Sequence, residues 1–189
     1  PMVIVNAAMS ADGKIALSNR KQLRISSDED MKRVFHLRNA CDGILVGSGA
    51  VLADDPKLTV KEQYVDNPSQ PVRIVLDSQL KTPTDALVVN ERAKTILMVS
   101  DHVSIEKSFG DHVEIIRCPQ KENGFLNLCF VLSSLFERGI RTLLVEGGGT
   151  VINGFLRERL VDDLYIYVGS LIIGGAQTPT LADGLGITD

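Results

Sequence analysis

Short runs of apolar and β-branched residues recur along the chain and are separated by polar stretches rich in turn residues. Uninterrupted runs of this kind are typical of strands that are buried on both faces of a sheet. They predict strands at residues 3–9, 43–47, 71–76, 95–100, 113–116, 142–145 and 162–170. Residues 58–60 are expected to form a further extended segment.

Apolar residues at helical spacing lie between several of these strands. An amphipathic helix over residues 126–138 is predicted by apolar positions at i, i+3, i+4, i+7 and i+8, namely Leu128, Val131, Leu132, Leu135 and Phe136. Asn127 and Gly139 suit its two ends. A first helix is predicted over residues 28–39, because Ser26 and Glu29 have the spacing of a capping box. A short helical turn is expected at residues 48–52.

The alternation of strands and helices predicts an α/β fold. In such a fold the sheet is mainly parallel and helices cover both of its faces. The length of 189 residues favours a single domain over residues 1–189.

The stretch RTLLVEGGGTVINGFL, residues 141–156, combines a buried strand, three glycines and the apolar spacing of a helix. Gly147, Gly148 and Gly149 allow a ligand to approach the backbone closely, and the start of a helix favours an anion. This pattern predicts a phosphate-binding turn at Gly147, Gly148 and Gly149. A tight strand-to-helix turn without a ligand is the alternative, since neither the GxGxxG spacing nor a P-loop ending is present.

Polar residues lie in or near the carboxyl ends of several predicted strands. They are Asn6, Ser48, Asp54, Ser78 and Glu146. Ligands of open α/β sheets bind at the carboxyl ends of the strands, so these side chains are expected to share one rim. Asp54 and Asp55 are adjacent carboxylates, for which a capping role is favoured over a metal site. The residues alone indicate a site for a phosphorylated, nucleotide-like ligand and no particular reaction.

Composition narrows the class of partner. The formal net charge of −4 and the pI of about 5.4 argue against nucleic acid or an anionic membrane as the main partner. No apolar stretch approaches the length of a transmembrane helix, and no basic region precedes the first apolar run. Three cysteines without a CxxC motif, and histidines without metal-ligand spacing, indicate neither disulfides nor a metal site. A cytoplasmic location is expected.

Five stretches taken together resemble one family. They are NAAMSADGKIA, LRNACDGILVGSGAVLADDPKLTV, QPVRIVLDS, LLVEGGGTVINGFL and LVDDLYIYVGSLIIGG. In this order they are similar to the reductases of riboflavin biosynthesis, which are related in fold to dihydrofolate reductase. The resemblance implies a three-layer, dihydrofolate-reductase-like fold with a mostly parallel mixed sheet. It also implies NADPH as hydride donor, a ribosylaminopyrimidine 5′-phosphate as substrate, and a homodimer.

The resemblance also assigns roles to individual residues. Cofactor contacts are expected at Ala50, Asp54, Ser78, Gly147, Gly148, Gly149 and Thr150, and substrate contacts at Asn6, Arg38, Leu58, Lys61 and Glu146. Glu146 is the candidate catalytic residue. Arg38, with Lys21, Arg24 or Lys61, is expected to hold the 5′-phosphate.

Three departures from the family pattern stand out. Ala50 replaces a usual Thr, so one hydroxyl contact to the cofactor is missing, and Lys61 replaces a frequent Arg. The final antiparallel hairpin of the family is not expected within residues 1–189.

Several functions stay open. The H-x-E and P-C-x-x-C motifs of a zinc deaminase are absent, which favours the stand-alone archaeal or fungal reductase of the 2,5-diamino compound. A reductase of the deaminated 5-amino compound and a dihydrofolate reductase are alternative enzymes. A nucleotide-binding homologue without catalysis is the alternative from another class.

Overall fold

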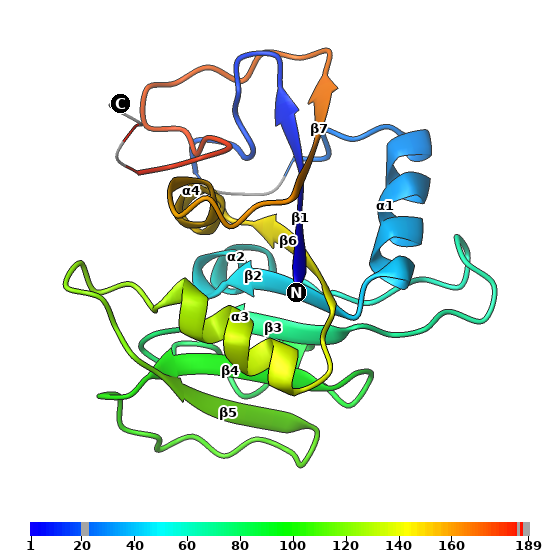
Figure 1. Cartoon of the computed structure of the whole chain (residues 1–189). Helices are drawn as coiled ribbons and strands as arrows, with labels where there is room; N and C mark the ends of the chain where they lie inside the picture. Colours follow the sequence, from blue (N-terminus) through cyan, green and yellow to red (C-terminus); the bar gives the residue numbers. More distant parts are fainter. Residues whose placement is uncertain (20–22, 185, 187–189) are drawn as a thin grey trace.

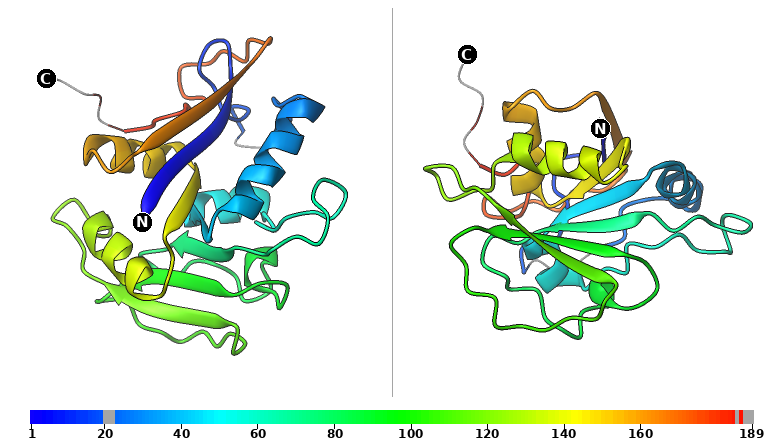
Figure 2. Two further views of the ribbon diagram at one scale, coloured as in Figure 1. Left: turned by 45° about the vertical axis from the view of Figure 1, so that its right-hand side comes forward. Right: turned by 60° about the horizontal axis from the view of Figure 1, so that its bottom comes forward.

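The computed structural model of the chain describes residues 1–19, 23–184 and 186. Within these residues, seven strands form one sheet that is flanked by α-helices (Figures 1 and 2). The strands are β1 (Met2–Ser10), β2 (Gly43–Gly47), β3 (Val72–Leu76), β4 (Thr95–Ser100), β5 (Val113–Cys118), β6 (Thr142–Gly147) and β7 (Asp163–Gly169). The helices are α1 (Asp28–Ala40), α2 (Ser48–Asp54), the 3-10 turn η1 (Leu87–Val89), α3 (Leu128–Glu137) and α4 (Gly149–Arg157). No helix in this part of the chain has the length and apolar composition that a membrane span requires.

The strands lie in the order β5-β4-β3-β2-β6-β1-β7. Every pairing among the described strands is parallel, with Val5 opposite Val145 between β1 and β6, for example. The expectation of a mixed sheet is therefore wrong for the described residues. That expectation came from the resemblance to the family, whereas β7 pairs parallel to β1 and forms one edge of the sheet. Parallel pairing brings the carboxyl ends of all seven strands to one rim.

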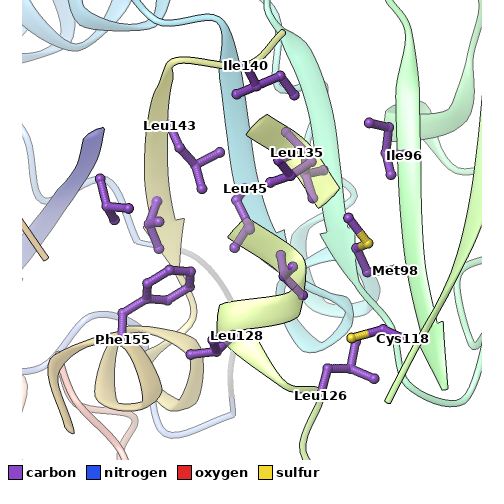
Figure 3. Packing of buried hydrophobic residues seen from close by; sticks show 14 of the residues in the cluster. Leu45, Ile96, Met98, Cys118, Leu126, Leu128, Leu135, Ile140, Leu143 and Phe155 are labelled. Atoms are coloured by element: carbon purple, nitrogen blue, oxygen red, sulfur yellow. The ribbon is translucent and has the colours of Figure 1, made fainter. Parts of the chain in front are cut away.

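Two apolar cores separate the sheet from its helices, because successive strand residues point to opposite faces. On one face α3 and α4 pack against the sheet, with Leu128, Leu135 and Phe155 close to Leu45 and Leu143 (Figure 3). On the other face α1 and α2 contribute, among others, Leu37 and Val51, which pack with Ile44 and Leu144. The prediction of an α/β fold with helices on both faces is confirmed.

The structure corrects two local predictions. Helix α1 is capped by Ser27 rather than Ser26: the hydroxyl of Ser27 accepts a hydrogen bond from the backbone N–H of Asp30 at 3.2 Å. Residues 58–60 form no strand, since Leu58 has a left-handed backbone with φ of 49°. The amide of Gln70 substitutes for a neighbouring strand, because it accepts from Val60 N at 2.8 Å and donates to Val60 O at 3.0 Å.

A turn after β1 holds the segment that follows β7. The Asp12 carboxylate accepts hydrogen bonds from the Ser10 hydroxyl at 2.6 Å and from the backbone N–H groups of Ile173 and Gly174 at 3.1 and 2.7 Å. These bonds, of which the one from Ser10 is the strongest influence, lower the pKa of Asp12 from 3.8 to about 2. The folded chain thus stabilises the ionised form of the Asp12 carboxyl group.

Asp12→Asn is expected to destabilise the protein at pH 7, because the amide cannot accept at both of its terminal atoms. The folded-state pKa lies below the unfolded value, so the contribution of Asp12 is complete above about pH 4 and is lost as the pH falls through about 2. Urea unfolding of both proteins across this range should show a difference in the free energy of unfolding that disappears at the acid end. Asp85→Asn, at an exposed aspartate, is the control. A difference that does not change with pH would contradict this role.

Candidate active site

A cavity of about 1260 Å³ opens at the rim where the parallel strands end. Its wall is built from the end of β1, the β2–α2 and β6–α4 junctions, the end of β3, and loop segments around residues 23–26, 121–126 and 179–184. A cavity of this size accommodates two small ligands side by side. The cavity therefore lies at the carboxyl ends of the strands, where the sequence predicted a ligand site.

The glycine turn forms one wall of this cavity. Strand β6 ends at Gly147, α4 begins at Gly149, and Gly148, Gly149 and Thr150 line the cavity. No side chain caps α4, and the carbonyl of Gly148 accepts from Val151 N and Ile152 N at 2.9 and 3.1 Å. An uncapped helix start directed at a cavity favours an anion.

The three glycines are needed for different reasons. Gly147 has a φ of 120°, a conformation that other residues rarely adopt. A Cβ on Gly148 would meet nothing within 4 Å, so this position leaves the cavity open. A Cβ on Gly149 would lie 2.3 Å from the carbonyl oxygen of Thr180, so this position admits the segment that follows β7.

Glu146 lies at the end of β6, beside the glycine turn, and lines the cavity. Arg38 of α1 donates to both of its carboxylate oxygens, from Nε at 2.8 Å and from Nη2 at 2.6 Å. The remaining guanidinium nitrogen, Nη1, donates to the carbonyl of Thr59 at 3.2 Å. The two side chains are only 17% and 11% exposed. Burial alone would lower the pKa of Arg38, but the charge and hydrogen bonds of Glu146 outweigh burial and raise it.

Asn6 lies next to Glu146 in the register that pairs Val5 with Val145. Its side-chain oxygen accepts from Arg33 Nη2 at 2.8 Å, and Arg33 Nε donates to Asp30 at 2.8 Å. Asn6 and Leu58 are buried and Arg38 is partly buried, and none of the three is part of the cavity wall. Of the five substrate contacts expected from the sequence, Glu146 and Lys61 thus lie in the cavity wall and the other three do not.

The cations expected near a substrate phosphate are distributed unevenly. Lys61 and Arg24 line the cavity, although Arg24 also forms an ion pair with Asp28. The ammonium of Lys61 lies 5.3 Å from the ring centre of Phe35. Lys21 falls in residues 20–22, which lie outside the described residues. A neighbouring cavity of about 560 Å³ shares Lys61 with the main one.

The expected cofactor residues outside the glycine turn also reach the cavity. Ala50 and Asp54 of α2 and Ser78 after β3 line it. Partial burial raises the pKa of Asp54. The neighbouring Asp55 has a different role, since its carboxylate accepts from the backbone N–H of Leu87 at 2.7 Å, at the start of η1. The two adjacent carboxylates therefore have different surroundings, Asp54 in the cavity wall and Asp55 at the backbone of η1.

Some residues of the cavity wall were not expected from the sequence. They include Phe125, Pro179 and Asp183, together with Lys121 and Glu158, whose side chains form an ion pair at 2.7 Å. They belong to loops that carry no motif, and only the folded chain brings them to the rim.

Comparison with protein families and curated proteins gives consistent matches. The family model for the RibD C-terminal domain matches residues 1–189. The chain is 40% identical to the 2,5-diamino-6-ribosylamino-4(3H)-pyrimidinone 5′-phosphate reductase of Archaeoglobus fulgidus, with 97% of this chain and 87% of the relative covered. The protein of the same name from Methanothermobacter thermautotrophicus is 38% identical, with 100% and 87% covered.

Solved structures agree with the sequence matches. The chain resembles the deaminase/5-amino-6-(5-phosphoribosylamino)uracil reductase of Thermotoga maritima with a TM-score of 0.81 and 29% identity, over 99% of this chain and 49% of that one. It resembles the riboflavin biosynthesis reductase Rib7 of Saccharomyces cerevisiae with a TM-score of 0.79 and 28% identity, over 100% and 81%.

Gly149→Ala is expected to lower the free energy of unfolding by about 2 kcal/mol, the scale of overpacking a tight contact. The added methyl group would collide with the backbone of Thr180, which cannot rotate away as a side chain can. Gly148→Ala is the matched control, because its methyl group would enter open space. Urea unfolding of the two variants gives the comparison. Equal stability of the two would show that residues 178–184 do not pack on α4 in solution.

Proposed function

Since the chain belongs to the RibD C-terminal domain family, we propose that it reduces 2,5-diamino-6-ribosylamino-4(3H)-pyrimidinone 5′-phosphate in riboflavin biosynthesis. The ribosyl group becomes a ribityl chain, and NADPH supplies the hydride. The observation that carries the proposal is the cavity that joins the uncapped glycine turn to the Arg38–Glu146 pair. The reductases named above, at 38–40% identity, favour the 2,5-diamino compound as substrate. Residues 1–189 act as one reductase domain in this proposal.

The cavity suits a nicotinamide dinucleotide. The start of α4 at Gly148, Gly149 and Thr150 would hold the pyrophosphate, since its N–H groups and dipole favour an anion. Ala50, Asp54 and Ser78 would line the remainder of the cofactor site. The cofactor supplies hydride, and the protein supplies position and charge.

Glu146 is placed to act on the substrate sugar. Its two oxygens each accept one hydrogen bond from Arg38, which leaves further lone pairs for ribose hydroxyls. Reduction at the anomeric carbon proceeds most readily from the ring-opened imine. Glu146 would orient the hydroxyls and assist the proton movement that opens the ring, and Arg38 would hold the carboxylate in place.

The phosphate of the substrate is assigned to Lys61 and Arg24, which line the cavity. Arg38 was expected to contact this phosphate. Each of its three guanidinium nitrogens donates a hydrogen bond to Glu146 or Thr59, which supports a role for Arg38 in positioning Glu146.

In this proposal the protein is cytoplasmic and forms a homodimer. Strand β7 forms one edge of the sheet and exposes Leu164, Ile166 and Val168, which alternate along it. Exposed apolar side chains on an edge strand favour association with another chain.

The function is tested by following NADPH oxidation with the 2,5-diamino substrate, its deaminated 5-amino counterpart and dihydrofolate side by side. The highest kcat/KM is expected for the 2,5-diamino substrate. Preference for the 5-amino compound would assign the reaction of the Thermotoga maritima reductase, and turnover of dihydrofolate alone would reject the riboflavin pathway. NADPH binding without turnover of any substrate would indicate a binding protein.

Glu146→Gln is expected to reduce kcat by roughly 10²-fold, the scale of losing an acid–base group. NADPH affinity should be retained or slightly increased, because a negative charge near the glycine turn is removed. Glu114→Gln is the matched control, since this glutamate is also held by an arginine, Arg138, at 2.6 Å but lies outside the cavity wall. Steady-state kinetics of both variants test the acid–base role of Glu146, and full activity of Glu146→Gln would exclude it.

Gly148→Val is expected to raise the dissociation constant of NADPH at least ~10-fold, about 1.4 kcal/mol. The branched side chain would project into open space at the start of α4 and block the approach of the pyrophosphate. The midpoint temperature of its thermal unfolding should stay close to that of the natural protein, because φ of Gly148 is −70° and suits other residues. An unchanged NADPH titration with the folded variant would place the cofactor elsewhere.

A further inference from the structure

The segment after β7 crosses the start of α4 and completes the cavity. Ile15 N donates to Pro179 O at 3.0 Å, and Leu181 N donates to Gly13 O at 3.2 Å, so the segment is anchored to the turn after β1. The backbone of Thr180 and the backbone N of Asp183 pass within 2.3 and 3.0 Å of the place where a Cβ of Gly149 would stand. Pro179, Asp183 and Gly184 consequently belong to the cavity wall.

The two oxygens of the Asp183 carboxylate have different surroundings. Oδ1 accepts from the backbone N–H and the hydroxyl of Thr180 at 2.9 and 2.6 Å, which fixes the side chain. Oδ2 lies 3.0 Å from the ideal Cβ position of Gly149, in the first turn of α4. No hydrogen bond to Oδ2 is found among the described residues, so this oxygen keeps its capacity to accept.

The charge of Asp183 is unusual for a site that binds a pyrophosphate. Glu146 has Arg38 as its counter-charge, whereas no cation forms an ion pair with Asp183 in the described part of the chain. An unpaired carboxylate beside the glycine turn repels the same anion that the turn attracts. A carboxylate in this position is favourable when it accepts hydrogen bonds from hydroxyl groups of the ligand, as acidic residues do in dinucleotide sites.

We propose that Asp183 Oδ2 accepts hydrogen bonds from the 2′- and 3′-hydroxyls of the nicotinamide-side ribose. This inference depends on the proposed function, because it requires NADPH at the glycine turn. Of the two riboses of NADPH, only the nicotinamide-side ring has both hydroxyls free, since the adenosine ring carries the 2′-phosphate. Asp183 is therefore a cofactor-binding residue in addition to those of α2, β3 and the glycine turn.

The test compares two ligands that share an anionic group and differ in the ribose. The dissociation constants of NADPH and of inorganic pyrophosphate, the latter as a competitor of NADPH, are measured for the natural protein, Asp183→Asn and Thr180→Val. The asparagine keeps an acceptor for Thr180 and removes the charge. The valine removes the Thr180 hydroxyl from the turn and keeps the carboxylate.

Asp183→Asn is expected to weaken NADPH binding about 5-fold and to leave pyrophosphate binding equal or tighter. The ratio of the two dissociation constants, NADPH over pyrophosphate, should rise at least about 5-fold, and in Thr180→Val it should stay within about twofold. Tighter binding of both ligands by Asp183→Asn would show that Asp183 repels anions without contacting a hydroxyl group. Equally weaker binding of both ligands by Asp183→Asn would show a structural role for the turn. The same change of the ratio in Thr180→Val would also show a structural role. Each of these results overturns the assignment.

The two levels of the proposal fail differently. If the natural protein does not bind NADPH, or pyrophosphate does not compete with it, the cofactor site of the proposed function is wrong and the role of Asp183 falls with it. If the natural protein binds both ligands and the ratio is unchanged in Asp183→Asn, only the role of Asp183 is wrong.

Discussion

The bidentate ion pair between Arg38 and Glu146 is the interaction on which the site depends. An unpaired Glu146 would repel a bound phosphate by roughly 3 kcal/mol at 5–6 Å and an effective dielectric near 20. Removing both groups from water is costly, and only good geometry offsets that cost. Two parallel hydrogen bonds at 2.8 and 2.6 Å supply the geometry. The pair thereby allows a carboxylate to stand next to an anion-binding turn.

The same pair couples helix α1 to the rim of the sheet. Arg33 reaches Asn6 on β1, and Arg38 reaches Glu146 on β6, so two arginines of one helix bind neighbouring strands. The buried ring of Phe35 lies between them in sequence and stacks on Tyr64 with ring centres 4.6 Å apart. Movement of α1 would therefore disturb the carboxylate of Glu146 and the loop that carries Lys61 together. This arrangement favours a rigid site in which α1 sets the position of Glu146.

The sequence predicted features that depend on a few neighbouring residues. Buried strands were recognisable from uninterrupted apolar runs, and the glycine turn from its place between a strand and a helix. The partner of Arg38 was not predictable, because Glu146 is 108 residues away and a cation at a helix end has many possible partners. The same reason applies to Gln70, whose side chain replaces a strand partner for Val60, and to Asp183, which no motif marks. Membership of a family suggested which residues belong to the site but not which of them form the cavity wall.

In the proposed function, the cavity would separate two anion sites that lie toward opposite sides of the sheet. The glycine turn leads into α4, which packs on one core, whereas Lys61 follows α2 and lies near Phe35 of α1, on the other side. Two phosphorylated ligands bound in this way keep their charges apart, so each anion meets its own cations or N–H groups. Glu146 lies at the strand end between these two regions and is itself neutralised by Arg38. The reacting carbons of the two ligands would then meet beside the carboxylate of Glu146, whose charge is already balanced by Arg38.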